Sequence, residues 1–371
     1  MAFDNGSLSF CVYRLDEDLP EDHLTLFAEH AALPLKQIKN EPSSGWSARH
    51  LLETDFTPET CYVEDFLQVH FRTSELKIST PLLKARCAQV EFKIMSEEQL
   101  SGINRKRKKE IRENITDEMM AHAQPTIKGF PLVFDPEKKL LYVGTSSTKA
   151  ADEAIGLLIE STGISPIPYS PQTCLAEFLG ESHNNYDPIV ISDSGEKPEE
   201  TWVGRDFLTW IWHFCEFEDA EFTVPDLGVF HVSLDGPINL ISETNGARES
   251  VVRKGIPTLS PEAHSALCDG KKLKSAKVAI ARGDDIWSFT LDADTFCFKS
   301  MKLPDGTEFQ YAPHFNERVE SLYVFQEAFF GLFKQFVDRF GGDKRDENLA
   351  NMKAWLKERE NTVYMTDQIG S

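Results

Sequence analysis

The sequence predicts an α+β protein in which antiparallel sheets are combined with long amphipathic helices. Residues 222–298 contain short alternating segments separated by Gly, Pro and Asp, a pattern typical of antiparallel strands. Residues 81–123 and 315–339 instead carry apolar side chains at helical spacing. Because strand and helix patterns do not alternate regularly along the chain, we do not expect a doubly wound parallel sheet.

Periodicity in the first half of the chain predicts a mixture of strands, hairpins and helices. Apolar residues alternate with small or polar ones over 7–15, and Gly163 follows a helical pattern directly. The expected elements are, in order, a strand at 7–15, a helix at 20–31, a strand at 61–72, two helices within 81–123 divided at 101–102, a hairpin at 130–143, a helix at 148–162 and an edge strand at 164–169.

The second half begins with a turn-rich loop at 180–200 and an aromatic helix at 204–215. We interpret the aromatic stripe of this helix as core and not as a base-stacking surface, because it has helical spacing among acidic residues. The stripe comprises Phe207, Trp210, Ile211, Phe214 and Phe217. The later expected elements are strands at 230–234, 274–281 and 286–291, a helix at 260–267 capped by Ser260, and a helix at 315–339 closed by Gly341-Gly342.

These patterns divide the chain into four predicted parts. The divisions are an N-terminal α+β part at 1–80, a part with a basic helix and a hairpin at 81–180, a part with the aromatic helix and antiparallel sheet at 181–310, and a helical part at 311–371.

Charge restricts the functions that the chain can serve. There are 39 Lys and Arg against 60 Asp and Glu, for a net charge of −21, which argues against phosphate binding over the whole surface. Residues 177–226 hold 13 acidic and two basic side chains, so this region should face away from phosphates. With no run of 18 apolar residues and no Lys or Arg before Arg14, we expect neither a membrane span nor a signal peptide, and a cytoplasmic protein.

The densest local charge is nevertheless positive. Residues 101–112 contain six basic side chains and one acid, Glu110. On a helix this density spreads charge around most of the cylinder, which predicts contacts with phosphates; a solvated face with pairs such as Lys109 and Glu113 is the alternative. The six basic residues are Arg105, Lys106, Arg107, Lys108, Lys109 and Arg112.

A second basic group enters a predicted strand and comprises Lys271, Lys272, Lys274 and Lys277. Strand alternation would send Lys272 and Lys274 to one face and the other two to the opposite face. The group is a candidate for phosphate binding, and protection of an edge strand explains it equally well.

Candidate catalytic and metal-binding residues are few. Four aspartates could form a metal cluster for a nuclease: Asp284, Asp285, Asp292 and Asp294. The favoured interpretation is that they are turn residues, since Asp is common in turns. His264 and Cys268 lack two further ligands, so we expect no metal site there and no cofactor. The seven scattered cysteines are interpreted as reduced core thiols. These cysteines are Cys11, Cys61, Cys87, Cys174, Cys215, Cys268 and Cys297.

The order of these pieces resembles the RdgC family of bacterial recombination-associated proteins. The strongest match is the run 138–168, which has the family's strand, small polar turn, Lys-Ala pair, helix and Pro-flanked exit. Further similar segments lie at 12–15, 205–212, 289–304 and 317–323, the last three resembling the longer branch of the family.

The resemblance implies a head-to-head homodimer that closes into a ring and encircles DNA. Such a ring would bind single- and double-stranded DNA without sequence preference, restrain the strand-exchange recombinase and associate with the nucleoid. The family's basic helix maps onto 105–112, and a further basic position maps onto Arg253, next to Lys254. Where family members often have Leu-Pro-Arg-Ala-Phe after the basic helix, this chain has Met-Ala-His-Ala-Gln at 120–124, ending in Gln124.

Two other functions remain open at this point, although we expect no enzyme. One is a metal-dependent exonuclease that uses the four aspartates. The other is a protein-interaction module that docks partners on its acidic 177–226 region, through Glu216, Glu218, Asp219 and Glu221.

Overall fold

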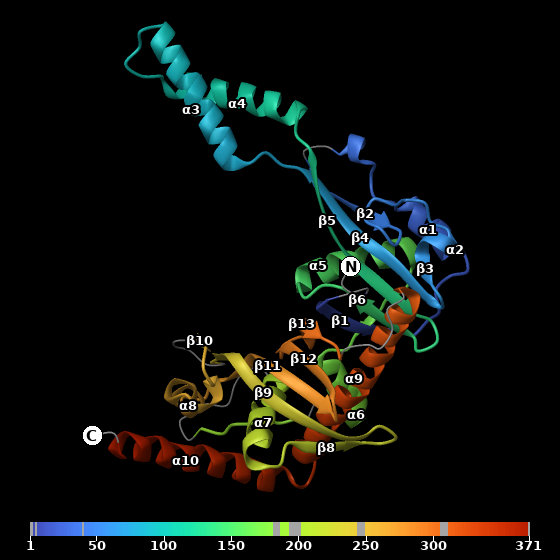
Figure 1. Cartoon of the computed structure of the whole chain (residues 1–371), viewed down its shortest axis with the longest axis vertical. Helices are drawn as coiled ribbons and strands as arrows, with labels where there is room; N and C mark the ends of the chain where they lie inside the picture. The colour runs from blue at the N-terminus through green and yellow to red at the C-terminus, as the bar shows by residue number, and fades with distance from the viewer. Residues whose placement is uncertain are drawn as a thin grey trace.

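The computed structural model describes residues 3, 6–38, 41–180, 186–192, 202–242, 249–304 and 311–369, with the side chains of 311–314 and 359–369 left aside. Two β-rich halves lie edge to edge, and a helical arm projects from the N-terminal half (Figure 1). The strands pair antiparallel and the helices pack around them, which confirms the predicted α+β class.

The strands described form one 13-stranded sheet that runs through both halves. Its order is β10-β9-β11-β12-β13-β1-β6-β5-β4-β2, with β3, β7 and β8 paired at the side. Because β1 pairs with β13 on one edge and β6 on the other, the N-terminal strand joins the two halves. The strands are β1 Leu8–Arg14, β2 Ser43–Ser47, β3 Tyr62–Val63, β4 Phe66–Leu76, β5 Pro125–Asp135, β6 Leu140–Val143, β7 Ile167–Pro168, β8 Glu221–Val224, β9 Gly228–Ile241, β10 Glu249–Val252, β11 Lys272–Arg282, β12 Asp285–Asp292 and β13 Cys297–Lys302.

The helices fall into three groups. Those packed against the N-terminal half of the sheet are α1 His23–Glu29, α2 Pro58–Cys61 and α5 Thr148–Thr162. Those of the C-terminal half are α6 Pro171–Leu179, α7 Val203–Phe217, α8 Pro261–Cys268, α9 Tyr311–Phe340 and α10 Arg345–Ile369. The arm contains α3 Thr80–Glu97 and α4 Arg105–Ala121.

The main core is aromatic and centres on α9. The ring centroid of Phe329 lies 5.7 Å from that of Phe207, 5.1 Å from Phe296 and 5.0 Å from Phe298. Four residues of the α7 stripe are buried as expected, but Phe217 is 52% exposed, so its assignment to the core was wrong. The stripe ends one turn early because Phe217 is the last residue of α7, where the helix ends.

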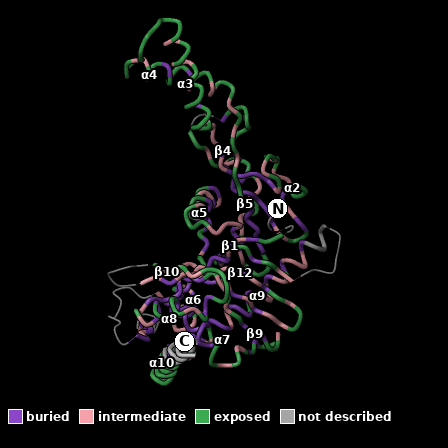
Figure 2. Tube along the Cα trace, turned by 60° about the vertical axis from the view of Figure 1, so that its left-hand side comes forward, coloured by how far each residue is buried: buried purple, intermediate pink, exposed green. Residues whose placement is uncertain are grey.

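The arm is thinly packed. Its helices share a small core of Leu83, Ile111 and Ile115, and Figure 2 shows most of the rest of the arm exposed. The predicted break at 101–102 is confirmed, because α3 ends at Glu97 and α4 begins at Arg105. The extended ends of β4 and β5 carry the arm away from the sheet (Figure 1).

Other predicted elements are confirmed with shifted bounds. Ser147 caps α5 by accepting from the amide of Ala150, and Gly163 ends it in the left-handed region with φ 77°. Ser260 caps α8 by accepting from Ala263 at 3.1 Å. The single strand expected at 61–72 is a hairpin of β3 and β4, turning at Glu64 with φ 53°. Most of the loop expected at 180–200 lies outside the described residues.

Two cysteines correct the expectation of seven reduced thiols. Cys11 and Cys297 form a disulfide, with Cα atoms 4.6 Å apart and a separation of 286 positions in sequence. The pairing of β1 with β13 brings the two residues together, which sequence spacing does not show. The disulfide therefore ties the N-terminal strand to the C-terminal half of the sheet.

Candidate nucleic-acid interface

The basic helix α4 is built by local signals. Asn104 caps it, its Oδ1 accepting from the amide of Arg107 at 2.8 Å, while Ile111 and Ile115 seat the helix against α3. Its first turn contains no acid and is strongly basic, although the helix dipole favours anions there. The charge of this turn therefore does not serve helix stability.

Three of the six cations on α4 are paired with carboxylates. Arg107 donates to Glu98 at 2.6 Å, which lowers the pKa of Glu98. Lys108 Nζ lies 3.1 Å from Glu91, and Lys109 lies 3.6 Å from Glu113, the pair named as the alternative in the sequence. These three cations tie α4 to α3 or to its own next turn.

The other three cations are Arg105, Lys106 and Arg112. Each is exposed, and no carboxylate of the described residues lies within 4 Å of any of them. Arg105 and Arg112 are spaced i, i+7, so they lie on one stripe of the helix, and Lys106 lies beside it. A stripe of this kind can neutralise several phosphates of one nucleic-acid strand.

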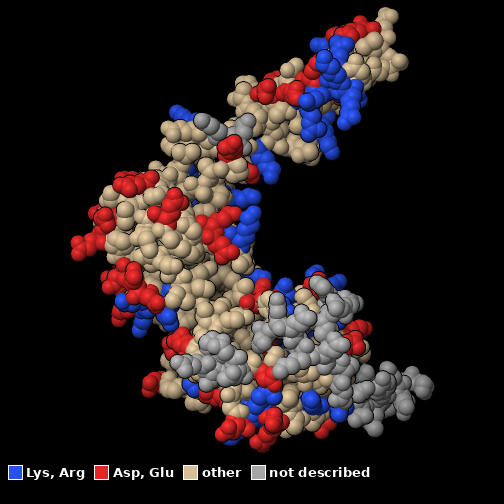
Figure 3. Space-filling model, turned by 180° about the vertical axis from the view of Figure 1, so that it is seen from behind, with Lys and Arg blue, Asp and Glu red and all other residues tan. Residues whose placement is uncertain are grey.

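The molecule is hollowed on the side to which the arm leans. Figure 3 shows Lys and Arg gathered on the arm where it overhangs the hollow, with further Lys and Arg along the wall and the opposite rim. β10 lies below the arm on the same side of the molecule (Figures 1 and 2). Arg253 and Lys254 are exposed directly after β10, and the positive φ of Lys254, 68°, marks the turn.

The second basic group does not join this surface. Lys271 is buried and donates to Ser250 Oγ at 2.7 Å, and Lys272 is buried with its Nζ 2.6 Å from Asp206. Lys274 lies 3.6 Å from Asp294 and Lys277 lies 3.9 Å from Asp235. All four therefore neutralise or satisfy groups of the C-terminal half, and we leave them out of the interface.

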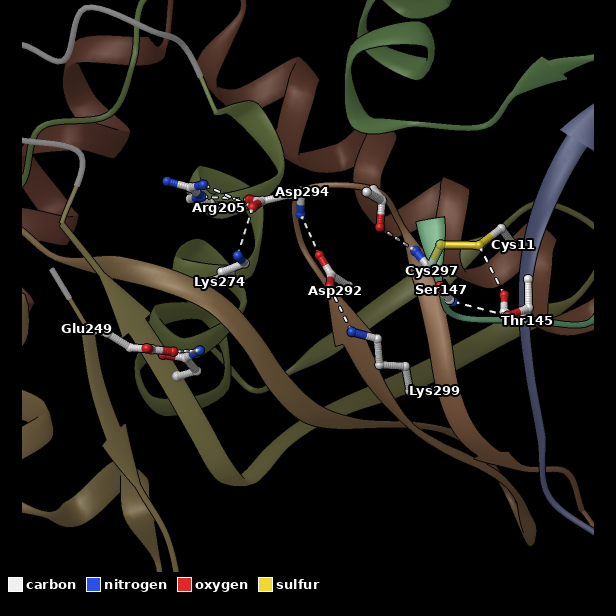
Figure 4. Close-up of polar contacts among 12 residues, drawn as sticks. Cys11, Thr145, Ser147, Arg205, Glu249, Lys274, Asp292, Asp294, Cys297 and Lys299 are labelled. Atoms are coloured by element: carbon white, nitrogen blue, oxygen red, sulfur yellow. Dashed lines mark hydrogen bonds and ion pairs between the residues drawn. A yellow bond between two sulfur atoms is a disulfide. The ribbon is translucent and has the colours of Figure 1, made fainter. Parts of the chain in front are cut away.

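The four aspartates also do not converge. Asp284 and Asp285 lie at one end of β12, and Asp292 and Asp294 at the other, roughly 20 Å apart at the rise of a strand. Arg205 and Lys274 point to Asp294, and Lys299 to Asp292 (Figure 4). In the part of the chain described, no group of three or more His, Cys, Asp or Glu residues is arranged to hold a metal.

Three of the four acidic residues proposed as a docking face have partners within the protein, although Glu216, Asp219 and Glu221 are exposed. Glu216 accepts hydrogen bonds from the indole nitrogens of Trp212 and Trp355, at 2.7 and 3.0 Å. Glu218 lies 2.6 Å from Arg339, so the two acids connect α7 to α10 and α9. Glu221 lies 2.8 Å from His231.

A pocket of about 320 Å³ lies at the root of the arm, between the start of α3 and the end of α4. Lys77 and Arg86 line one part of it and His122 and Gln124 another. Lys77 and Arg86 were not predicted as site residues. Their only signal in the sequence is that they flank the start of a predicted helix.

The fold and this surface define a mixed helix and antiparallel-sheet protein with a cation-bearing arm. A family model described as "RdgC: Putative exonuclease, RdgC" matches residues 8–186, a span that includes β1, the arm and α5. This match over 8–186 supports membership of the RdgC family, as the sequence resemblance indicated. No curated protein matches the chain. Among the helices described, none has the length and apolar character needed to cross a membrane.

Proposed function

We propose that this protein binds single- and double-stranded DNA without sequence preference, through the cations that face its hollow. The observation that carries the proposal is the stripe on α4, where Arg105, Lys106 and Arg112 are exposed and lack carboxylate partners among the described residues. Phosphate contacts position a protein on DNA and carry no base information, so binding through such contacts alone should be independent of sequence. Arg253 and Lys254 on the opposite rim are the second proposed contact.

A strongly acidic chain can bind DNA only if its cations are concentrated. The net charge of −21 repels a duplex from most of the surface, while the arm places positive charge over a concave face. The acids near α7 support this interpretation, since Glu216 and Glu218 are held in contacts within the protein.

The proposed assembly is a homodimer whose two hollows face each other and enclose a duplex as a ring. The hollow of one chain, open on one side, supports this proposal (Figure 3). By occupying DNA, the ring would restrain the strand-exchange recombinase during homologous recombination, and it would localise with the nucleoid. Encirclement lowers the dependence on affinity, because escape requires ring opening or sliding off an end.

Binding and assembly are tested together on the full chain. The dissociation constant for two unrelated duplexes of equal length is measured from low to moderate salt. We expect equal affinities and a slope in log K against log[salt] of about −0.9 for each phosphate neutralised. Light scattering with and without duplex should give a dimer. A slope near zero would contradict DNA binding by these cations, and a strict monomer would contradict the ring.

A second candidate is an exonuclease, which the description of the matching family favours. The four aspartates do not support exonuclease activity, because cations of the same half of the protein neutralise three of them. Incubation of end-labelled linear duplex with Mg²⁺ or Mn²⁺ is the direct test, and release of nucleotides that increases with enzyme would support it.

A further inference from the structure

The pocket at the root of the arm combines an apolar surface with positive charge. Ile78 and Leu82 of the α3 start and Met119 of α4 supply the apolar part. Lys77 and Arg86 supply the cations, and Glu118 is the acid among the lining residues. The Arg86 guanidinium contacts the Gln89 side chain at 3.3 Å, and no carboxylate of the described residues lies within 4 Å of it.

This composition fits a flat, anionic ligand. Methionine and leucine side chains pack well against an aromatic ring, and a guanidinium recognises phosphate oxygens. The amide of Gln124 offers both donors and an acceptor, which suits the edge of a nucleobase. The volume of about 320 Å³ lies at the lower end of the range for small-molecule pockets.

We propose that the pocket at the root of the arm binds one unpaired nucleotide of a DNA strand. The base lies against Leu82 and Met119, and its phosphate is held by Arg86, whereas Lys77 lies 3.8 Å from Glu75. The pocket adjoins the C-terminal end of α4, so a strand that follows the helix stripe can place a nucleotide in it. This inference rests on the proposed DNA binding and adds a preference for strands with unpaired bases.

The test compares single-stranded and blunt duplex DNA of equal length on the full chain, by fluorescence anisotropy. Leu82→Asp places a carboxylate in the pocket, and Leu82 is 54% exposed, so folding should be unaffected. Phe92→Asp is the matched control: it adds the same charge to the same helix, at a residue 70% exposed and outside the pocket lining. Circular dichroism checks that both variants are folded.

We expect Leu82→Asp to weaken single-strand binding about tenfold, within the range of a lost base contact, and to change duplex binding less than twofold. Phe92→Asp should change neither by more than twofold. A second variant, Gln124→Ala, should weaken single-strand binding selectively by a few fold, and it decides the matter if Leu82→Asp does not fold. The proposed nucleotide site would be wrong if Leu82→Asp and Phe92→Asp changed the dissociation constants equally. It would also be wrong if Leu82→Asp weakened duplex and single-strand binding to the same extent. If the wild type binds duplex in a salt-dependent way but the pocket variants lose no single-strand binding selectively, only the proposed nucleotide site is refuted. If the wild type binds no DNA, both the proposed DNA binding and the nucleotide site are refuted.

Discussion

Lys272 illustrates how a single residue can look like a surface contact and be a structural one. Its side chain is 6% exposed and its Nζ lies 2.6 Å from Asp206, which is fully buried. Asp206 also accepts from the Tyr186 hydroxyl at 3.2 Å and the Ile189 amide at 3.0 Å. The pair therefore fixes the start of α7 against β11 and the segment at 186–192.

We predict that Lys272→Ala destabilises the protein by about 3–5 kcal/mol, because it leaves a buried carboxylate without its counter-charge. Chemical denaturation monitored by tryptophan fluorescence measures the loss. The control is Arg105→Ala, an exposed cation on α4 whose removal should cost less than about 0.5 kcal/mol. Comparable stability of the two variants would show that the buried pair contributes little.

A second residue links stability to pH. The pKa of His213 is lowered to about 4, chiefly by burial; Glu218 opposes the shift and Arg339 adds to it. The unfolded chain takes up a proton near pH 6.5 that the folded chain accepts only near pH 4, so acid favours unfolding across this window. The stability that His213 contributes is complete above about pH 6.5 and is lost as the pH falls toward 4.

The predicted consequence is a loss of up to about 3 kcal/mol between pH 6.5 and 4 that His213→Phe does not show. The measurement is the difference in unfolding free energy between wild type and variant at several pH values. Carboxylates titrate equally in both proteins, so the difference isolates His213. A difference that stays constant with pH would mean that His213 titrates normally.

At the scale of elements, helix α4 carries two sets of cations, which differ in whether a carboxylate is paired with them. Arg105, Lys106 and Arg112 are available, while Arg107, Lys108 and Lys109 are paired with acids. We predict that the triple change Arg105→Ala, Lys106→Ala and Arg112→Ala reduces the salt slope for DNA binding by about two to three, equally for unrelated duplexes. Stability should change little, since alanine favours helix.

The matched control is Arg107→Ala, Lys108→Ala and Lys109→Ala, which removes the same charge from the same helix. It should reduce the slope by less than about one, because those cations are already neutralised within the arm. If both triple variants lose binding equally, the net charge of the arm matters and the separate stripe does not. Neutralising Glu216 or Glu218 is unsuitable as a control, because both hold helices together.

Elements with strong local signals could be predicted from the sequence, and those made by distant partners could not. The cap Ser260 and the glycine after α5 lie within a few residues of the bounds that they set. β2 was not predicted, because its Ser-Ser-Gly-Trp-Ser sequence has weak strand propensity and depends on pairing with β4. The basic helix was predicted, but the division of its cations depends on Glu91 of α3 and on Glu98, which follows that helix.

At the scale of the whole molecule, one core connects parts that the sequence suggested were separate. The main cluster contains Val63, Tyr142, Phe207 and Phe329, one from each predicted part. The four-part division stays a prediction, since a shared core alone does not show how the parts fold. Contacts of this range could not be predicted, because no local pattern records that Tyr142 donates to Gln326 at 2.5 Å across 184 residues.

The Cys11–Cys297 disulfide is a covalent connection of this kind, between the start of the chain at β1 and the C-terminal half at β13. Linking residues 286 apart restricts the unfolded chain, and in the chain-entropy model such a large loop stabilises at the upper end of the usual range of about 2–5 kcal/mol. We predict that Cys11→Ser with Cys297→Ser lowers the free energy of unfolding by this amount. In the wild type, dithiothreitol should lower the denaturation midpoint toward that of the variant, whose own midpoint should not respond. Mass spectrometry of alkylated protein should find five free thiols without reductant and seven with it. A wild type with seven accessible thiols and a midpoint insensitive to reductant would show that the two halves are held by strand pairing and the aromatic core alone.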